Sequence, residues 1–159
     1  MRNRTHLIRR IVLWTLALGW LVVLFVLSTQ NGEESSELSL SLTHFLLRHL
    51  PFLSMTAEEF HPILRKITHF CIFAVEGFLF GLASSDSMSD RPAVALSLIF
   101  CAAMAALNEY SQTFAEGRSC ELRDMMIDFS GAVLGISVSV LVRWICLRIR
   151  RRRQCMTKI

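Results

Sequence analysis

The sequence predicts an all-α integral membrane protein, a four-helix bundle with an interfacial helix in the long outer loop between spans 1 and 2. Hydrophobic residues make up 53% of the 159 residues. They gather in four stretches, each long enough, at about 1.5 Å per residue, to cross most of a hydrocarbon core of about 30 Å. Basic residues flank the first and the last stretch. Length, composition and charge placement therefore agree on a membrane fold.

Four spans account for most of the apolar residues. The stretch from Ile11 to Leu27 carries no charge, and no clear A-x-A cleavage site follows it, so we interpret it as an uncleaved span and not as a signal peptide. We expect a single membrane domain over residues 1–159, because too few residues remain for a soluble domain of any size. The predicted spans cover about residues 11–28, 66–84, 92–110 and 125–145.

The basic residues predict the orientation of the bundle. Residues 1–10 and 146–159 are basic tails, and the second tail contains four consecutive arginines. The positive-inside rule keeps such flanks in the cytoplasm, and an even number of spans places both termini on one side. We therefore expect a multi-pass protein of the cell membrane with both termini cytoplasmic. This placement of charge favours contact with the lipid bilayer over nucleic-acid binding, although the net charge is +4.

The outer loop after the first span is predicted to contain a helix that lies on the membrane. A polar cluster at 28–36 precedes Leu38–Phe52, which is apolar with helical spacing. This segment is short for a span and carries Arg48 and two histidines. We interpret it as an interfacial helix that ends near Pro51.

Capping and turn residues predict where the later helices begin. Thr56, followed by two glutamates, is typical of an N-cap and an acidic first helical turn. Ser84–Arg91 is predicted to be a tight polar turn, and Pro92 suits the first turn of the third span. The fourth span carries Gly131 and Gly135, a spacing that allows close packing between membrane helices.

Three groups of polar residues are predicted to meet at the outer ends of the spans. Polar side chains within spans are costly, so each needs a physical reason. Under the predicted topology the three groups lie on the same side of the membrane and at similar depth. They are Arg65, Lys66 and His69 opening span 2, Glu109 and Gln112 closing span 3, and Asp124 and Asp128 opening span 4, with Arg118 in the loop between the last two.

The roles of these residues follow from their chemistry. A buried acid is costly unless it is paired, so we predict that His69, Glu109 and Asp128 form a shared polar centre and are the candidate catalytic residues. We expect the basic side chains, Gln112 and Asp124 to bind a ligand around it. The alternative is that Arg65, Arg123 and Asp124 snorkel to lipid phosphates or stabilise helix ends.

Glu76 lies near the predicted midplane of the bilayer, on roughly the same helix face as His69. No basic residue in another span is expected at this depth, and Ser97 and Ser137 are the candidate neighbours. We predict a largely neutral, hydrogen-bonded side chain. A proton pathway is the alternative, and a transporter of this size would need a homodimer to form one.

The order and spacing of these motifs resemble the VanZ-like family of bacterial membrane proteins over about residues 8–145. Three positions depart from the family pattern: Asp128 stands where many members have Asn, Phe73 replaces a Tyr, and Ile72 replaces an acid. The family takes its name from low-level resistance to the glycopeptide teicoplanin, which implies activity at the cell envelope. The resemblance rests on Arg65-Lys66-x-x-His69-Phe70, Asn108-Glu109-x-x-Gln112-x-Phe114, Gly117-Arg118-Ser119 and Asp124-x-x-x-Asp128-x-x-Gly131-Ala132-x-x-Gly135.

Two classes of function remain open. The first is an envelope protein that binds a lipid, a lipid-linked precursor or a lipophilic glycopeptide, with Arg and Lys gripping phosphate or carboxylate. The second is a membrane enzyme that acts on a lipid-linked phosphate, with His69 as nucleophile or general base oriented by Glu109 or Asp128. These three side chains could also hold a divalent cation. The sequence contains no recognised catalytic signature or C-x-x-C motif, and it identifies no cofactor and no established metal site.

Overall fold

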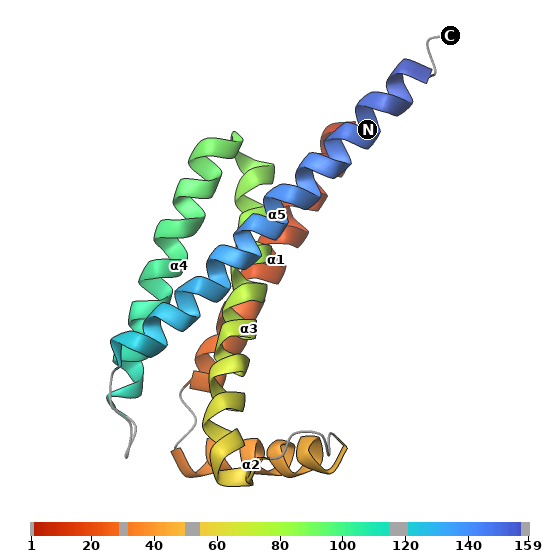
Figure 1. Ribbon diagram of the computed structural model, residues 1–159. Helices are drawn as coiled ribbons and strands as arrows, with labels where there is room; N and C mark the ends of the chain where they lie inside the picture. The colour runs from red at the N-terminus through yellow and green to blue at the C-terminus, as the bar shows by residue number, and fades with distance from the viewer. Residues whose placement is uncertain (1, 29–31, 50–54, 115–120, 157–159) are drawn as a thin grey trace.

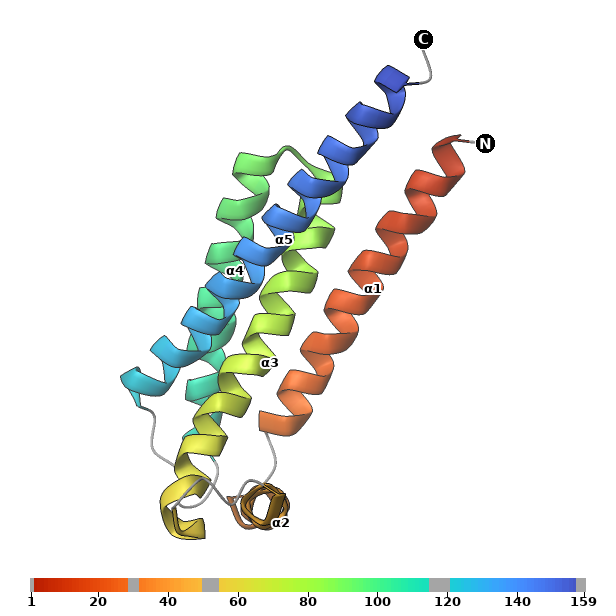
Figure 2. The ribbon, with the colours of Figure 1, turned by 45° about the vertical axis from the view of Figure 1, so that its right-hand side comes forward.

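Five helices form the regular structure of the described residues, and those residues contain no strand. The computed structural model describes residues 2–28, 32–49, 55–114 and 121–156. Four helices run lengthwise, whereas α2 lies across one end of the bundle (Figure 1). We call this the α2 end, and we call the opposite end, where both termini lie, the termini end (Figure 2). The helices are α1 (Arg2–Ser28), α2 (Gly32–His49), α3 (Ala57–Ser87), α4 (Asp90–Gln112) and α5 (Leu122–Met156).

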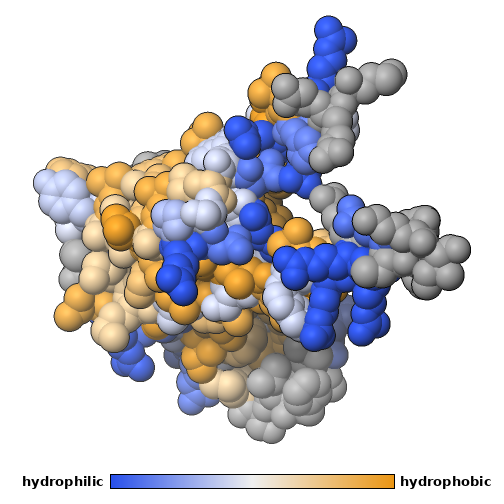
Figure 3. Space-filling view, turned by 90° about the horizontal axis from the view of Figure 1, so that it is seen from above, coloured by the Kyte–Doolittle hydropathy of each residue, from blue (hydrophilic) through white to orange (hydrophobic). Residues whose placement is uncertain are grey.

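Four helices are long and apolar enough to cross a membrane. Many of their apolar side chains point outward, and Val22 and Ile99 are 63% and 69% exposed. Lipid tails can cover such a surface, whereas exposing so large an apolar area to water would be unfavourable. At the termini end, hydrophilic residues gather around the helix ends beside a hydrophobic flank (Figure 3). The predicted all-α membrane bundle is confirmed. Its candidate spans are Arg4–Leu27, Ala57–Ser87, Asp90–Gln112 and Leu122–Ile149.

The helices extend beyond the predicted spans. α3 begins well before residue 66, because Thr56 caps it, and it continues through Pro62. The hydroxyl of Thr56 accepts a hydrogen bond from the backbone N–H of Glu59, at 3.3 Å, and the Glu59 carboxylate accepts one from the Thr56 N–H, at 3.0 Å. This reciprocal pair is a capping box and confirms the predicted N-cap. The described parts of both basic tails are helical as well.

Two predicted boundaries are wrong. α3 continues to Ser87 and α4 begins at Asp90, so the predicted turn Ser84–Arg91 shrinks to two residues. Serine can remain helical because its hydroxyl bonds a carbonyl in the preceding turn, as Ser84 does with Phe80, at 2.7 Å. The helix across the bundle end also begins earlier than predicted, at Gly32, within the polar cluster.

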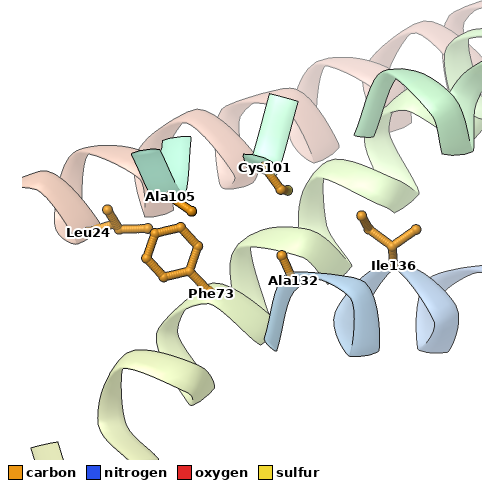
Figure 4. Close-up of a cluster of buried hydrophobic side chains, with 6 residues drawn as sticks. All are labelled: Leu24, Phe73, Cys101, Ala105, Ala132 and Ile136. Atoms are coloured by element: carbon orange, nitrogen blue, oxygen red, sulfur yellow. The ribbon is translucent and has the colours of Figure 1, made fainter. Parts of the chain in front are cut away.

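The core lies where the four lengthwise helices meet. Phe73 of α3 is 1% exposed and packs among apolar side chains from α1, α4 and α5 (Figure 4). Each of the four lengthwise helices contributes at least one residue to this cluster, so the cluster holds the bundle together. Its members are Leu24, Phe73, Cys101, Ala105, Ala132 and Ile136.

Glycine brings α3 and α5 into direct backbone contact. A Cβ atom added at Gly131 would collide with the carbonyl oxygen of Phe70, and one added at Gly135 would collide with that of Ala74. On α3, Gly77 faces the backbone of Ala132 in the same way. The close packing predicted for the two glycines of α5 is therefore realised, and α3 is their partner. This contact fixes the start of α5 beside the start of the membrane part of α3.

Candidate functional site

The three predicted polar groups lie together at the α2 end. α3 and α5 both run from this end towards the termini end, and α4 runs back to it (Figure 1). The beginnings of α3 and α5 and the end of α4 therefore converge. The α3–α5 glycine contact sets how closely the first two approach.

Asp128 is the buried centre of the group. Its side chain is 0% exposed, and its Oδ2 accepts a hydrogen bond from Asn108 Nδ2, at 3.0 Å. His69 Nδ1 lies 3.4 Å from the other carboxylate oxygen, which is ion-pair range and longer than an ordinary hydrogen bond of about 2.9 Å. α4 thus supplies a hydrogen-bond donor to this acid, and α3 supplies an imidazole at ion-pair distance from its other oxygen. The His69 side chain is 24% exposed, so it links the buried acid to the surface.

Glu109 lies beside this centre and makes different contacts. It is 2% exposed, and its carboxylate accepts a hydrogen bond from the backbone N–H of Glu121, at 3.2 Å. This bond ties the end of α4 to the segment that leads into α5. The carboxylate is close enough to interact electrostatically with Asp128, Asp124 and His69. The structure therefore brings the three predicted central residues into one neighbourhood, although the hydrogen bond of Glu109 goes to Glu121 and not to either of the other two.

The basic residues of α3 have partners on α4 and α5. Arg65 Nη2 donates a hydrogen bond to Gln112 Oε1, at 3.4 Å. Lys66 Nζ lies 3.7 Å from Asp124 Oδ1, and both side chains are about one third exposed. An exposed pair of this kind stabilises the fold little, so a ligand can displace it at small cost.

A pocket of about 280 Å³ opens where these side chains meet. It contains both acidic and basic groups, together with apolar surface from Pro62 and Ile127. Buried polar atoms without a described hydrogen-bond partner lie around it, among them Gln112 Nε2 and His61 Nε2. The lining residues are His61, Pro62, Arg65, Lys66, His69, Glu121, Asp124 and Ile127.

Sequence reasoning missed three residues of this region. His61 lies four residues before Arg65, on the same helix face, and that spacing could have identified it. Asn108 belongs to a recognised motif, but only the fold shows that its amide reaches Asp128. Glu121 precedes α5, and no sequence pattern identified it as a site residue. The predicted Arg118 lies outside the described residues.

The described residues hold no group of three His, Cys, Asp or Glu side chains arranged to bind a metal ion. The two acids near His69 approach it differently, since Asp128 faces the ring and Glu109 faces the backbone of Glu121. The metal-binding alternative for His69, Glu109 and Asp128 is thus not supported by the geometry of these residues.

Glu76 is separate from the site. It lies seven residues beyond His69, about 10 Å along α3, and is 0% exposed. The prediction that Glu76 is hydrogen-bonded is wrong, and its two candidate neighbours, Ser97 and Ser137, have other hydrogen-bond partners. Ser97 pairs with the hydroxyl of Ser84, at 2.8 Å, and Ser137 bonds the carbonyl oxygen of Val133 within its own helix. Among the described residues, Glu76 has no hydrogen-bond partner.

The comparison with protein families covers most of the chain, including every site residue that the structure describes. A family model described as VanZ/LLP1 matches residues 13–143. No curated protein and no solved structure matches the chain. The matched segment runs from the first span to the basic end of α5, and it includes all three polar groups. The chain belongs to the VanZ/LLP1 family, as the resemblance of its motifs predicted.

Proposed function

We propose that the pocket at the α2 end binds an amphiphile of the cell envelope: a lipid, a lipid-linked precursor or a lipophilic glycopeptide. The observation that carries this proposal is the position of the pocket. It combines Arg65 and Lys66 with apolar surface at the level where α3 and α5 enter their apolar segments. A ligand with a charged head and an apolar tail matches that combination. The family name supports a link to glycopeptide resistance.

The partners of the two basic residues suit anion binding. Gln112 is neutral, so its hydrogen bond holds the Arg65 guanidinium in place without cancelling its charge. Asp124 partly neutralises Lys66, but this pair is partly exposed and 3.7 Å apart, so a ligand anion can replace it. A guanidinium can grip a phosphate or carboxylate with two parallel N–H donors. Arg65 is therefore the main anchor for the head group, and Lys66 adds charge beside it.

We infer that the pocket faces the outside of the cell. The termini end carries the basic tails, which the positive-inside rule assigns to the cytoplasm. A reporter protein that fluoresces only in the cytoplasm, fused to the carboxyl terminus, tests this orientation. Fluorescence in intact cells is expected, and a dark, correctly inserted fusion would place the pocket inside.

Binding is tested with a polyprenyl phosphate presented in detergent micelles to the purified protein. Charge-assisted hydrogen bonds to phosphate are strong, so Arg65→Gln is expected to weaken binding about tenfold or more. Arg48→Gln is the matched control, because it removes the same charge from α2 at the same end but outside the pocket. The corresponding polyprenol, without phosphate, should bind weakly to both proteins. Equal binding by the Arg65 and Arg48 variants would refute the site.

A second function is favoured by one specific contact. Asp128 Oδ1 lies 3.4 Å from His69 Nδ1, within ion-pair range, so Nε2 is the ring nitrogen that can meet a ligand in the pocket. A carboxylate that orients an imidazole in this way is typical of a general base or nucleophile. The reaction would be hydrolysis of a lipid-linked phosphate, with Arg65 and Lys66 stabilising the developing negative charge.

His69→Gln separates the two functions. If the protein is an enzyme, this variant releases no phosphate from the polyprenyl phosphate yet still binds it. If the protein only binds, wild type releases no phosphate either. Phosphate release and binding are measured on the same preparations, so that loss of folding is recognised as loss of both.

A further inference from the structure

A groove at the termini end separates α1 from α5. It has a volume of about 420 Å³, and its walls include Arg9 and Leu13 of α1, Leu82 and Asp86 of α3, and Arg143 and Leu147 of α5. Both α1 and α5 pack against α3, but they share no substantial interface with each other. Figure 2 shows the upper parts of α1 and α5 apart from each other.

Hydrogen bonds to α3 hold α1 in place, apart from α5. The indole N–H of Trp14 donates to the hydroxyl of Ser87, at 3.0 Å, and that of Trp20 donates to the carbonyl oxygen of Ile72, also at 3.0 Å. Both acceptors belong to α3. The spacing between α1 and α5 is therefore part of the fold and does not depend on contact between them.

The rim of the groove carries two arginines in fixed positions. Arg9 is ion-paired with Asp86, and Arg143 Nε lies 2.9 Å from Asp90 Oδ1. A guanidinium has five N–H donors, so contact with one carboxylate leaves donors for a second anion. Each acid therefore orients its arginine but occupies only some of the N–H donors of the guanidinium.

Positive charge exceeds negative charge around this rim. The two acids are already paired, whereas further exposed arginines extend beyond them along α1 and α5. Arg148 lies over the ring of Trp144, 4.5 Å from its centroid, which is typical of side chains at a membrane interface. The additional exposed arginines are Arg10, Arg148, Arg151 and Arg152.

We propose that this groove binds an anionic phospholipid. One acyl chain lies along the apolar wall between Leu13 and Leu147, and the head-group phosphate lies between Arg9 and Arg143. Space between two separated helices inside a bilayer is filled by lipid chains, since water is absent there. Basic pockets between membrane helices suit anionic head groups at the same level. The groove is at the opposite end of the bundle from the pocket described above, so the two proposals stand or fall separately.

Native mass spectrometry of the detergent-purified full chain tests this site. The protein is mixed with equal amounts of phosphatidylglycerol and phosphatidylcholine, and the retained lipid is counted. Wild type is expected to retain phosphatidylglycerol preferentially. The double variant Arg9→Gln/Arg143→Gln should reduce its retention at least about fivefold, which is the effect of losing one basic residue near an anionic lipid.

Two controls keep this result interpretable. Arg91→Gln removes an exposed charge at the same end but outside the groove, and it should leave retention unchanged. Cys146→Trp fills the groove without changing charge, and it should reduce retention even if the arginine variants fold poorly. Inorganic phosphate should not displace the lipid, because it lacks acyl chains.

Three results would overturn the proposal. Equal losses for Arg91→Gln and the double variant would mean that general surface charge attracts the lipid. Undiminished retention by Cys146→Trp would mean that the groove is not the site. Displacement by inorganic phosphate would mean that no acyl chain contributes to binding.

Discussion

Asn108 of α4 donates a hydrogen bond to the carboxylate of Asp128 of α5, at 3.0 Å, and both side chains are buried. The same carboxylate faces His69 of α3. One acid therefore links three helices at the α2 end. Its contribution to folding and its contribution to the site can be separated by substitution.

Asp128→Asn and Asp128→Ala are expected to differ in stability. The Asn side chain can still accept the hydrogen bond from Asn108, so the melting temperature in detergent should stay close to that of wild type. The Ala variant leaves the buried amide of Asn108 without its acceptor, at a cost of about 1–3 kcal/mol. Both variants lose the charge that orients His69, so both should lose any phosphate release. Equal melting temperatures for the two variants would contradict the structural role of this bond.

Gly135→Val is expected to destabilise the bundle by about 1–3 kcal/mol or more, because its side chain would enter the backbone of α3. Gly19→Val on α1 is the matched control, since a Cβ there meets no atom within 4 Å. The measurement is the free energy of unfolding in mixed detergent micelles. A Gly19 variant as unstable as the Gly135 variant would show that valine harms these helices regardless of packing.

The hydroxyls of Ser84 and Ser97 lie 2.8 Å apart in the buried α3–α4 interface. A double-mutant cycle with Ser84→Ala and Ser97→Ala should give a favourable coupling energy of about 0.6 kcal/mol, typical of hydrogen bonds between membrane helices. The value is modest because each hydroxyl has one proton, so a serine that donates to the other must release the carbonyl oxygen of its own helix. A coupling energy of zero would mean that these intrahelical bonds satisfy both serines.

Glu76→Leu is expected to fold at least as stably as wild type. The carboxyl group of Glu76 is buried without a described hydrogen-bond partner, and an apolar side chain of similar size avoids its desolvation cost. Glu76→Lys, which places an amine in the same space, should unfold at a lower temperature. Thermal unfolding of the two variants and wild type in one detergent provides the comparison. A strongly destabilised Glu76→Leu protein would mean that the acid makes a stabilising contact.

The sequence predicted the membrane helices from its apolar stretches, and it predicted the convergence of the polar groups from the direction of the chain. Once four spans alternate in direction, the start of one span and the end of the previous one must share a side of the membrane. The order of His69, Glu109 and Asp128 along the chain therefore sufficed to place them at one end. Their depth followed from the fixed rise of a helix.

The rotation of each helix about its axis could not be predicted in the same way. Asn108 and Glu109 are neighbours in sequence, yet only the first reaches Asp128. The rotation depends on backbone contacts such as that between Gly135 and Ala74, which the spacing of glycines suggests without naming the partner helix. Because the rotation of the helices was not predicted, the expected hydrogen bonding of Glu76 was wrong.

α3 reaches from the pocket at the α2 end to the groove at the termini end, and it touches every other helix of the bundle. Arg65 and Asp86 therefore lie towards opposite ends of one continuous helix. Exchanging this helix between relatives would transplant both polar ends at once, whereas exchanging α1 would alter only one. Chimeras built at helix boundaries can thus assign a phenotype to one side of the membrane before any single residue is changed.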